Sequence, residues 1–228
     1  MAKKEVVEKE NVTEGDADVK ESVKKNENRQ ALWFFVIVII LFASFFVPYF
    51  YMGSLKSFEY VGADWRIEDY ENLRIYHGRF AALDGSNLNY NIYLRGDPRK
   101  NDVAVEGNFD MFKHGGIVSI SPEVDECRGE ISRAMIDLGA FLREGVGVGA
   151  LEVASTDKFV AVENERLYAT CEIVADRTLV VVDRGDESKI TQDEKNLYCY
   201  TIYIDDCNDI SSVEKFLIET LDDFGGKK

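Results

Sequence analysis

Three residue types are scarce in this chain. Its 228 residues include only 3 prolines, 2 histidines and 4 cysteines. Because no dense run of cysteine and histidine is present, the sequence argues against a histidine-rich metal enzyme, and we expect neither a metal nor a cofactor. Lysine and arginine are outnumbered by aspartate and glutamate, 27 to 42, which gives a formal net charge of −15. A nucleic-acid partner is therefore not expected, since it needs clusters of basic residues to meet phosphate.

One segment carries no charge. Residues 31–53 form an uncharged, mostly apolar run of 23 residues, and a helix rising about 1.5 Å per residue would cross a hydrocarbon core of about 30 Å with it. A cleaved signal peptide is the main alternative, but its apolar region covers only about 7 to 15 residues and ends at small residues. Here Ala43 and Ser44 are followed directly by Phe45. The run therefore predicts a single-pass signal anchor, a transmembrane helix that stays in the cell membrane.

The residues before this run predict a disordered cytoplasmic tail. Residues 1–30 carry 7 basic and 8 acidic side chains and no aromatic one, so they cannot bury enough apolar surface to offset chain entropy. Basic residues are more frequent in the 20 or so positions before the span than after it, which places the N-terminus inside. These basic residues are Lys20, Lys24, Lys25 and Arg29 before the span, and Lys56 and Arg66 after it.

All four cysteines follow the span, which predicts an extracytoplasmic domain over residues 54–228 with disulfides formed in an oxidising space. Four reduced core cysteines are the alternative. Cys127 lies near the start of the first predicted helix, just after the strand that ends at Ile120, and Cys207 lies between the strand that ends at Ile204 and the terminal helix. If those two strands run parallel, both cysteines lie at one sheet edge. Cys171 and Cys199 remain as the second pair, because a bond from Cys199 to Cys207 would have to close about 20 Å of extended strand.

Hydrophobic periodicity predicts an α+β domain. An N-terminal antiparallel β region is followed by a β-α-β unit, a β-meander and a terminal helix, with a sub-boundary near 108–115. Ser211 and Glu214 predict a capping box at the start of the last helix. The expected strands cover residues 58–67, 73–83, 88–94, 103–106, 116–120, 150–154, 159–162, 179–182, 189–191 and 198–204, and the expected helices cover 122–145 and 211–224.

The most distinctive stretch is YNIYLRGDPR, residues 90–99. Arg95 and Arg99 flank Asp97 at a proline turn, where the carboxylate can accept local hydrogen bonds and pair with a guanidinium. We expect a structural clamp, and recognition of an anionic ligand by the two arginines is the alternative.

The same stretch resembles a Y-x-x-Y-L-R-x-D-P-R segment of single-span archaeal membrane proteins. Those proteins also have a later Cys-Tyr strand followed by another cysteine, as in Cys199, Tyr200 and Cys207 of this chain. The resemblance covers most of the domain after the span. It implies an anchored domain and transfers no activity.

Each histidine precedes a glycine, which leaves room for a ligand beside His77 and His114. A membrane-anchored hydrolase would use one of them with neighbouring carboxylates, but no nucleophile elbow or HExxH motif accompanies either one. We therefore assign no catalytic residue. The sequence favours a binding domain within an envelope complex, with the membrane and other envelope proteins as its partners.

Overall fold

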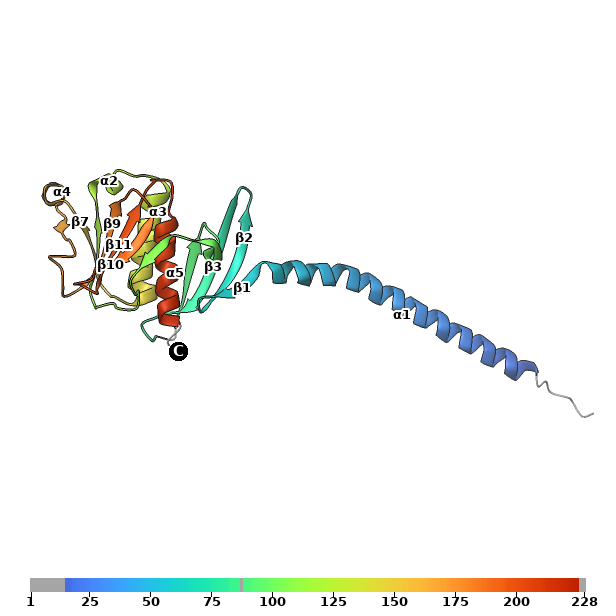
Figure 1. The fold of residues 1–228 in the computed structure, drawn as a ribbon. Coiled ribbons are helices and arrows are strands. Elements are labelled where there is room, and N and C mark those ends of the chain that lie inside the picture. The colour runs from blue at the N-terminus through green and yellow to red at the C-terminus, as the bar shows by residue number, and fades with distance from the viewer. Residues whose placement is uncertain (1–14, 87, 226–228) are drawn as a thin grey trace, which may run out of the picture. The chain divides into compact units, whose positions relative to one another are not determined.

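The computed structural model describes residues 15–86 and 88–225 (Figure 1). The chain divides into two compact units, residues 1–55 and 56–228. The first unit consists of α1 (Gly15–Leu55), one continuous helix of 41 residues. Its segment Leu32–Leu55 is long and apolar enough to cross a membrane, so it is suited to act as a membrane anchor or a signal.

Helix α1 begins earlier than the sequence predicts. Residues 15–30 are helical where we expected a disordered tail, while residues 1–14 of that tail lie outside the described residues. The difference has a simple physical origin, because the costly step in helix formation is nucleation. Once the apolar segment is helical, each further residue gains a backbone hydrogen bond as it joins.

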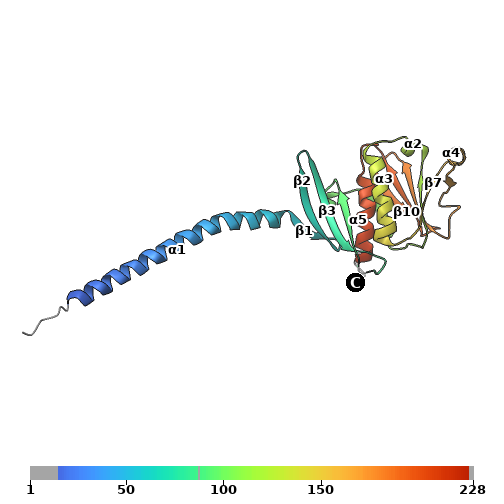
Figure 2. The same cartoon turned by 180° about the vertical axis from the view of Figure 1, so that it is seen from behind.

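The second unit contains two β-sheets with two helices between them, as both ribbon views show (Figures 1 and 2). The small sheet has four antiparallel strands in the order β1-β2-β3-β4. The large sheet is mixed, and its seven strands have the order β5-β10-β11-β9-β6-β7-β8. The small-sheet strands are β1 (Ser57–Tyr60), β2 (Ala63–Tyr70), β3 (Leu73–Ala81) and β4 (Asn89–Leu94). The large-sheet strands are β5 (Ala104–Glu106), β6 (Gly116–Ile120), β7 (Leu151–Ser155), β8 (Leu167–Tyr168), β9 (Thr178–Arg184), β10 (Lys189–Gln192) and β11 (Cys199–Ile204).

The helices of the second unit differ in length and role. The short ones lie in the connections of the large sheet, whereas α3 and α5 cover one of its faces. The α-helices are α2 (Pro122–Asp125), α3 (Glu130–Ala140), α4 (Lys158–Glu163) and α5 (Ser211–Gly225). The 3-10 turn η1 (Pro98–Lys100) lies between β4 and β5, and the π-helical turn η2 (Phe141–Val146) follows α3 directly.

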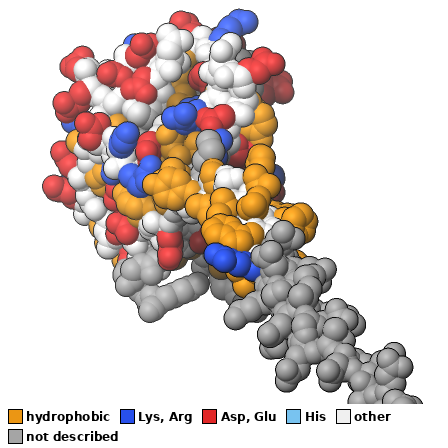
Figure 3. Space-filling model, turned by 90° about the vertical axis from the view of Figure 1, so that its right-hand side faces the viewer, with side chains coloured by type: hydrophobic (Ala, Val, Ile, Leu, Met, Phe, Trp, Pro, Cys, Tyr) orange, Lys and Arg blue, Asp and Glu red, His pale blue; other side chains and the backbone are white. Residues whose placement is uncertain are grey.

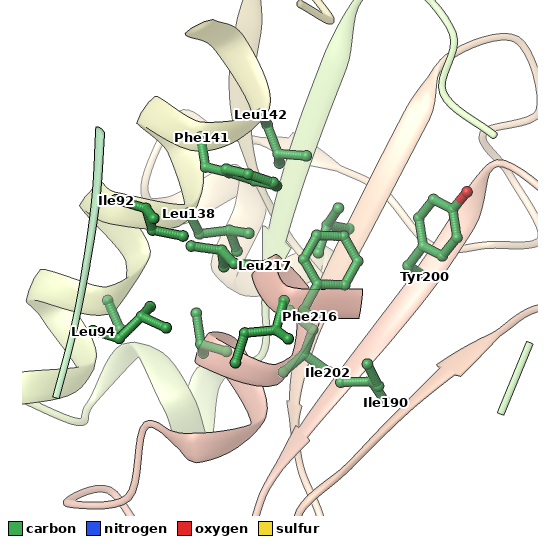
Figure 4. Packing of buried hydrophobic residues seen from close by; sticks show 14 of the residues in the cluster. Ile92, Leu94, Leu138, Phe141, Leu142, Ile190, Tyr200, Ile202, Phe216 and Leu217 are labelled. Atoms are coloured by element: carbon green, nitrogen blue, oxygen red, sulfur yellow. The ribbon is translucent and has the colours of Figure 1, made fainter. Parts of the chain in front are cut away.

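A single core cluster joins both sheets and both long helices. Figure 4 shows Ile92 of β4 beside Leu138 of α3, and Phe216 of α5 against Ile202 of β11. All four side chains are buried. Because α5 lies between two sheets, it is apolar on a wider stripe than a surface helix would be.

Two disulfides join segments that are distant in sequence. Cys127 pairs with Cys207, with Cα atoms 5.4 Å apart, and Cys171 pairs with Cys199 at 5.6 Å. Strands β6 and β11 both run parallel to β9, so the first pair lies where the carboxyl ends of parallel strands meet. The second pair ties the segment 169–177 to the start of β11, over the sheet face opposite to α3 and α5.

Local backbone geometry corrects three of the predicted elements. The strand expected over 58–67 is a hairpin, because Val61 and Gly62 adopt positive φ angles of 46° and 71° and turn the chain from β1 into β2. The helix expected over 122–145 is interrupted before α3, where Gly129 has a φ of 73°. Residues 159–162 form α4 rather than a strand, since Asp157 caps that helix by accepting hydrogen bonds from two backbone N–H groups.

The prediction that the last three strands form a β-meander is also wrong. Strand β11 lies between β9 and β10, parallel to β9 and antiparallel to β10. This order has a physical reason: β11 is the more apolar of the two later strands, and the central position buries Cys199, Tyr200 and Ile202 completely. The shorter and more polar β10 lies nearer the edge of the sheet.

Candidate functional site

Of the three residues predicted to form a structural clamp, Arg95, Asp97 and Arg99, the last two pair with each other. Asp97 caps η1 and accepts hydrogen bonds from Arg99 Nε at 2.9 Å and Arg99 Nη2 at 2.8 Å. The Arg99 guanidinium also lies over the ring of Phe58, 3.8 Å from its centroid. Hydrogen bonding to Arg99 lowers the pKa of Asp97. With its fork already paired, Arg99 has less capacity to hold an anionic ligand.

Arg95 points elsewhere, toward α3. Its Nε lies 3.4 Å from Glu130 Oε2, so the two arginines of this stretch do not form one anion site. The backbone of the same turn has a different partner: the N–H groups of Arg95 and Gly96 donate to the two carboxylate oxygens of Glu214, the second at 3.0 Å. This contact joins the end of β4 to the first turn of α5.

Glu214 therefore does not form the expected capping box with Ser211. Asp209 takes that role by accepting hydrogen bonds from Ser211 N at 2.8 Å and Ser211 Oγ at 2.9 Å. Little room is left for a side chain at position 96, because a Cβ at Gly96 would lie 3.0 Å from Glu214 Oε2. Sequence reasoning identified Glu214 as a capping residue and missed its long-range contact, since the partners are more than 100 positions away.

Burial dominates the electrostatics of Glu214. Its residue surface is only 7% exposed, and burial raises its pKa to about 7, against the lowering effect of the two backbone N–H groups. Arg133 of α3 lines the same narrow cleft, together with Asp137, whose pKa burial also raises. The cleft measures about 10 Å³, which leaves room for a single water molecule at most. The arrangement suits a structural contact better than a substrate site.

His77 lies in β3 on the outer face of the small sheet, among polar partners. Its Nδ1 is 3.1 Å from Glu68 Oε1, its Nε2 is 3.0 Å from Asn91 Oδ1, and its ring stacks on Tyr93. Hydrogen bonds from Tyr70 and His77 lower the pKa of Glu68. Both ring nitrogens of His77 therefore already have hydrogen-bond partners. Figure 3 looks onto the side that carries this sheet, where hydrophobic side chains lie among charged ones.

His114 lies apart from His77, in the loop before β6. It lines a pocket of about 160 Å³ with Phe112, Lys113, Phe224 and the turn at residues 146–148, a lining that contains no carboxylate. The ring also packs against the turn, since a Cβ at Gly149 would meet it at 2.4 Å. Throughout residues 15–86 and 88–225, no three His, Cys, Asp or Glu side chains are grouped as a metal site requires.

Several exposed apolar side chains of the second unit surround the last strand of the large sheet. We call this surface the β8 edge, and it comprises Val153 of β7, Phe159 and Val162 of α4, Leu167 and Tyr168 of β8, and Ile173. Helix α4 packs against β7 and β8 and lies at the end of the sheet in Figure 1. Phe159 is 85% exposed and Val162 is 75% exposed. Exposed apolar side chains gathered at one end of a domain are typical of interaction sites.

A pocket opens within the β8 edge. It has a volume of about 260 Å³, slightly below the roughly 300 to 1,000 Å³ of small-molecule sites. An ion pair between Arg177 and Glu152, 3.0 Å apart, lies at the pocket. The Cys171–Cys199 disulfide holds the segment that supplies one wall. The lining residues are Ile117, Glu152, Leu167, Tyr168, Ala169, Ile173, Val174, Asp176 and Arg177.

Sequence reasoning missed the β8 edge because it predicted a strand where α4 lies. Phe159 and Val162 are three positions apart, the spacing of one helical face, and this was the available signal. Comparison with known proteins adds no assignment: no family, curated protein or solved structure matches this chain.

Proposed function

We propose that this protein is a single-pass, membrane-anchored binding domain that is displayed outside the cytoplasm and holds a protein partner of the cell envelope. The observation that carries the proposal is the β8 edge, where six large apolar side chains remain exposed at one end of a folded, strongly acidic domain. Such a surface is costly to leave in water, and interaction sites are the usual reason for retaining one.

Two further observations support the location. The apolar segment of α1 is long enough to remain as an anchor, and the basic residues before it favour a cytoplasmic N-terminus. Both disulfides lie in the second unit, which suits an oxidising compartment outside the cytoplasm. The surface would then face partners in the cell envelope.

The hydrolase alternative has weaker support from the geometry. A general base must reach the proton it removes, but both ring nitrogens of His77 face the oxygens of Glu68 and Asn91. His114 has Lys113 rather than a carboxylate beside it in its pocket. A binding role needs neither histidine to act as a base.

Photo-crosslinking in intact cells tests the proposal. A photoreactive amino acid at position 159 should give discrete crosslinked products with another envelope protein. The matched control is position 88, where Leu88 is 70% exposed in the second unit, away from the β8 edge. Absence of products from position 159, or identical products from both positions, would contradict a binding role for the β8 edge.

A further inference from the structure

The β8 edge also indicates what kind of partner fits it, an inference that rests on the proposed binding function. We propose that the partner is an extended protein segment with an apolar anchor flanked by lysine or arginine. Three observations lead to this proposal: the apolar centre with its pocket, the acidic surroundings, and an open strand edge beside them.

The apolar centre fits side chains rather than a cofactor. Phe159 and Val162 stand on the outer face of α4, while Ala161 between them is buried. Next to β8, the pocket of about 260 Å³ has Ile117, Leu167 and Ile173 in its wall. A cavity of this size accepts one or two apolar side chains of a partner, which is how protein hot spots are anchored.

The surroundings of this centre are acidic. The segment 150–178 contains six acidic residues and three basic ones, and two of the basic residues are already paired within the domain, Arg166 with Asp125 and Arg177 with Glu152. Complementary potentials favour association and like charges oppose it. A basic partner is therefore favoured, and a second copy of this acidic chain is disfavoured. The acidic residues are Glu152, Asp157, Glu163, Glu165, Glu172 and Asp176.

The strand edge suggests that the segment is extended. Strand β8 pairs only with Ala154 and Ser155 of β7, so within the described chain the backbone of residues 151–153 has no strand on that side. Glu152 of this edge lines the pocket, whereas the half-exposed Val153 points to the other face of the sheet. An extended segment could pair with this free edge and place alternate side chains on the neighbouring pocket.

Binding of two synthetic peptides to the full-length protein in nanodiscs tests the partner chemistry. The peptides share one apolar core containing phenylalanine and differ only in their flanks, three lysines or three glutamates on each side. We expect the lysine-flanked peptide to bind at least about 10-fold more tightly, with a difference that shrinks as salt is added. Equal affinities would overturn the proposal.

Variants locate the binding on the surface. Phe159→Ser should weaken binding of the lysine-flanked peptide about 10-fold, and so should the charge reversal Glu163→Lys with Glu165→Lys. Leu88→Ser is the matched control and should leave the affinity unchanged. The side chains at positions 88, 159, 163 and 165 are all exposed, so each variant should still fold. Circular dichroism checks that the fold is retained. Equal loss in the control would contradict the assignment.

The outcomes separate this inference from the proposed function. Crosslinks from position 159 in cells, together with no preference for the lysine-flanked peptide, would keep the binding function and overturn the basic-apolar partner. Self-association of the full-length protein that Phe159→Ser abolishes, without peptide binding, would overturn it in favour of a second copy. Loss of both the crosslinks and the peptide binding would contradict the binding function itself.

Discussion

The buried carboxylate of Glu214 makes the stability of the second unit depend on pH. Its pKa is raised from 4.5 to about 7 in the folded protein. The folded state therefore binds a proton that the unfolded state has lost over this range, so the contribution of Glu214 to the free energy of unfolding falls as pH rises from about 4.5 to above 7. Glu214→Gln removes this titration while keeping the shape of the side chain.

The magnitude follows from the shift. One pKa unit corresponds to about 1.4 kcal/mol, so ionising Glu214 in place costs the folded state about 3 kcal/mol above pH 7. Near pH 4 the carboxyl of Glu214 is protonated in the folded state, and like the amide of the Glu214→Gln variant it offers one carbonyl oxygen to the N–H groups of Arg95 and Gly96. The two proteins should thus be similarly stable near pH 4, and the variant should be more stable by up to about 3 kcal/mol near pH 8.

Urea unfolding of the full-length protein, followed by circular dichroism at several pH values, measures this difference. Groups common to both proteins cancel in the comparison, including Arg133 and Asp209, which also act on the Glu214 carboxyl. Glu163→Gln, at an exposed position of α4, is the control and should run parallel to the wild type. Parallel curves for Glu214→Gln as well would refute the reasoning, because they would mean that Glu214 titrates alike in the folded and unfolded states.

Three other predictions concern the clamp, the disulfides and the topology. Asp97→Ala should lower the free energy of unfolding by about 1 to 3 kcal/mol through loss of charge-assisted bonds; unchanged urea unfolding with lost partner binding would favour an anionic ligand instead. Replacing Cys171 and Cys199 by serine should cost about 2 to 5 kcal/mol, and non-reducing peptide mapping of the wild type should find this pair rather than free thiols. External protease on intact cells should digest the second unit and spare an N-terminal epitope, and the reverse pattern would contradict the proposed orientation.

Features that depend on neighbouring residues could be read from the sequence. The apolar span follows from an uninterrupted run, and the α+β class follows from the periods of strands and helices. Asp97 and Arg99 are only two positions apart, so their pairing is a local event. The cysteine pairs join distant segments and are nevertheless those expected, because strand ends and helix starts limit where each sulfur can lie.

Features that depend on distant residues needed the tertiary structure. The burial of β11 decided its place between β9 and β10, which no local pattern specifies. Glu214 meets Arg95 and Gly96 only because α5 packs beside the end of β4. The apolar residues of the β8 edge are exposed because no further element of the described chain packs over α4 and β8. A sequence records which side chains are apolar, but long-range packing decides which of them remain in contact with water.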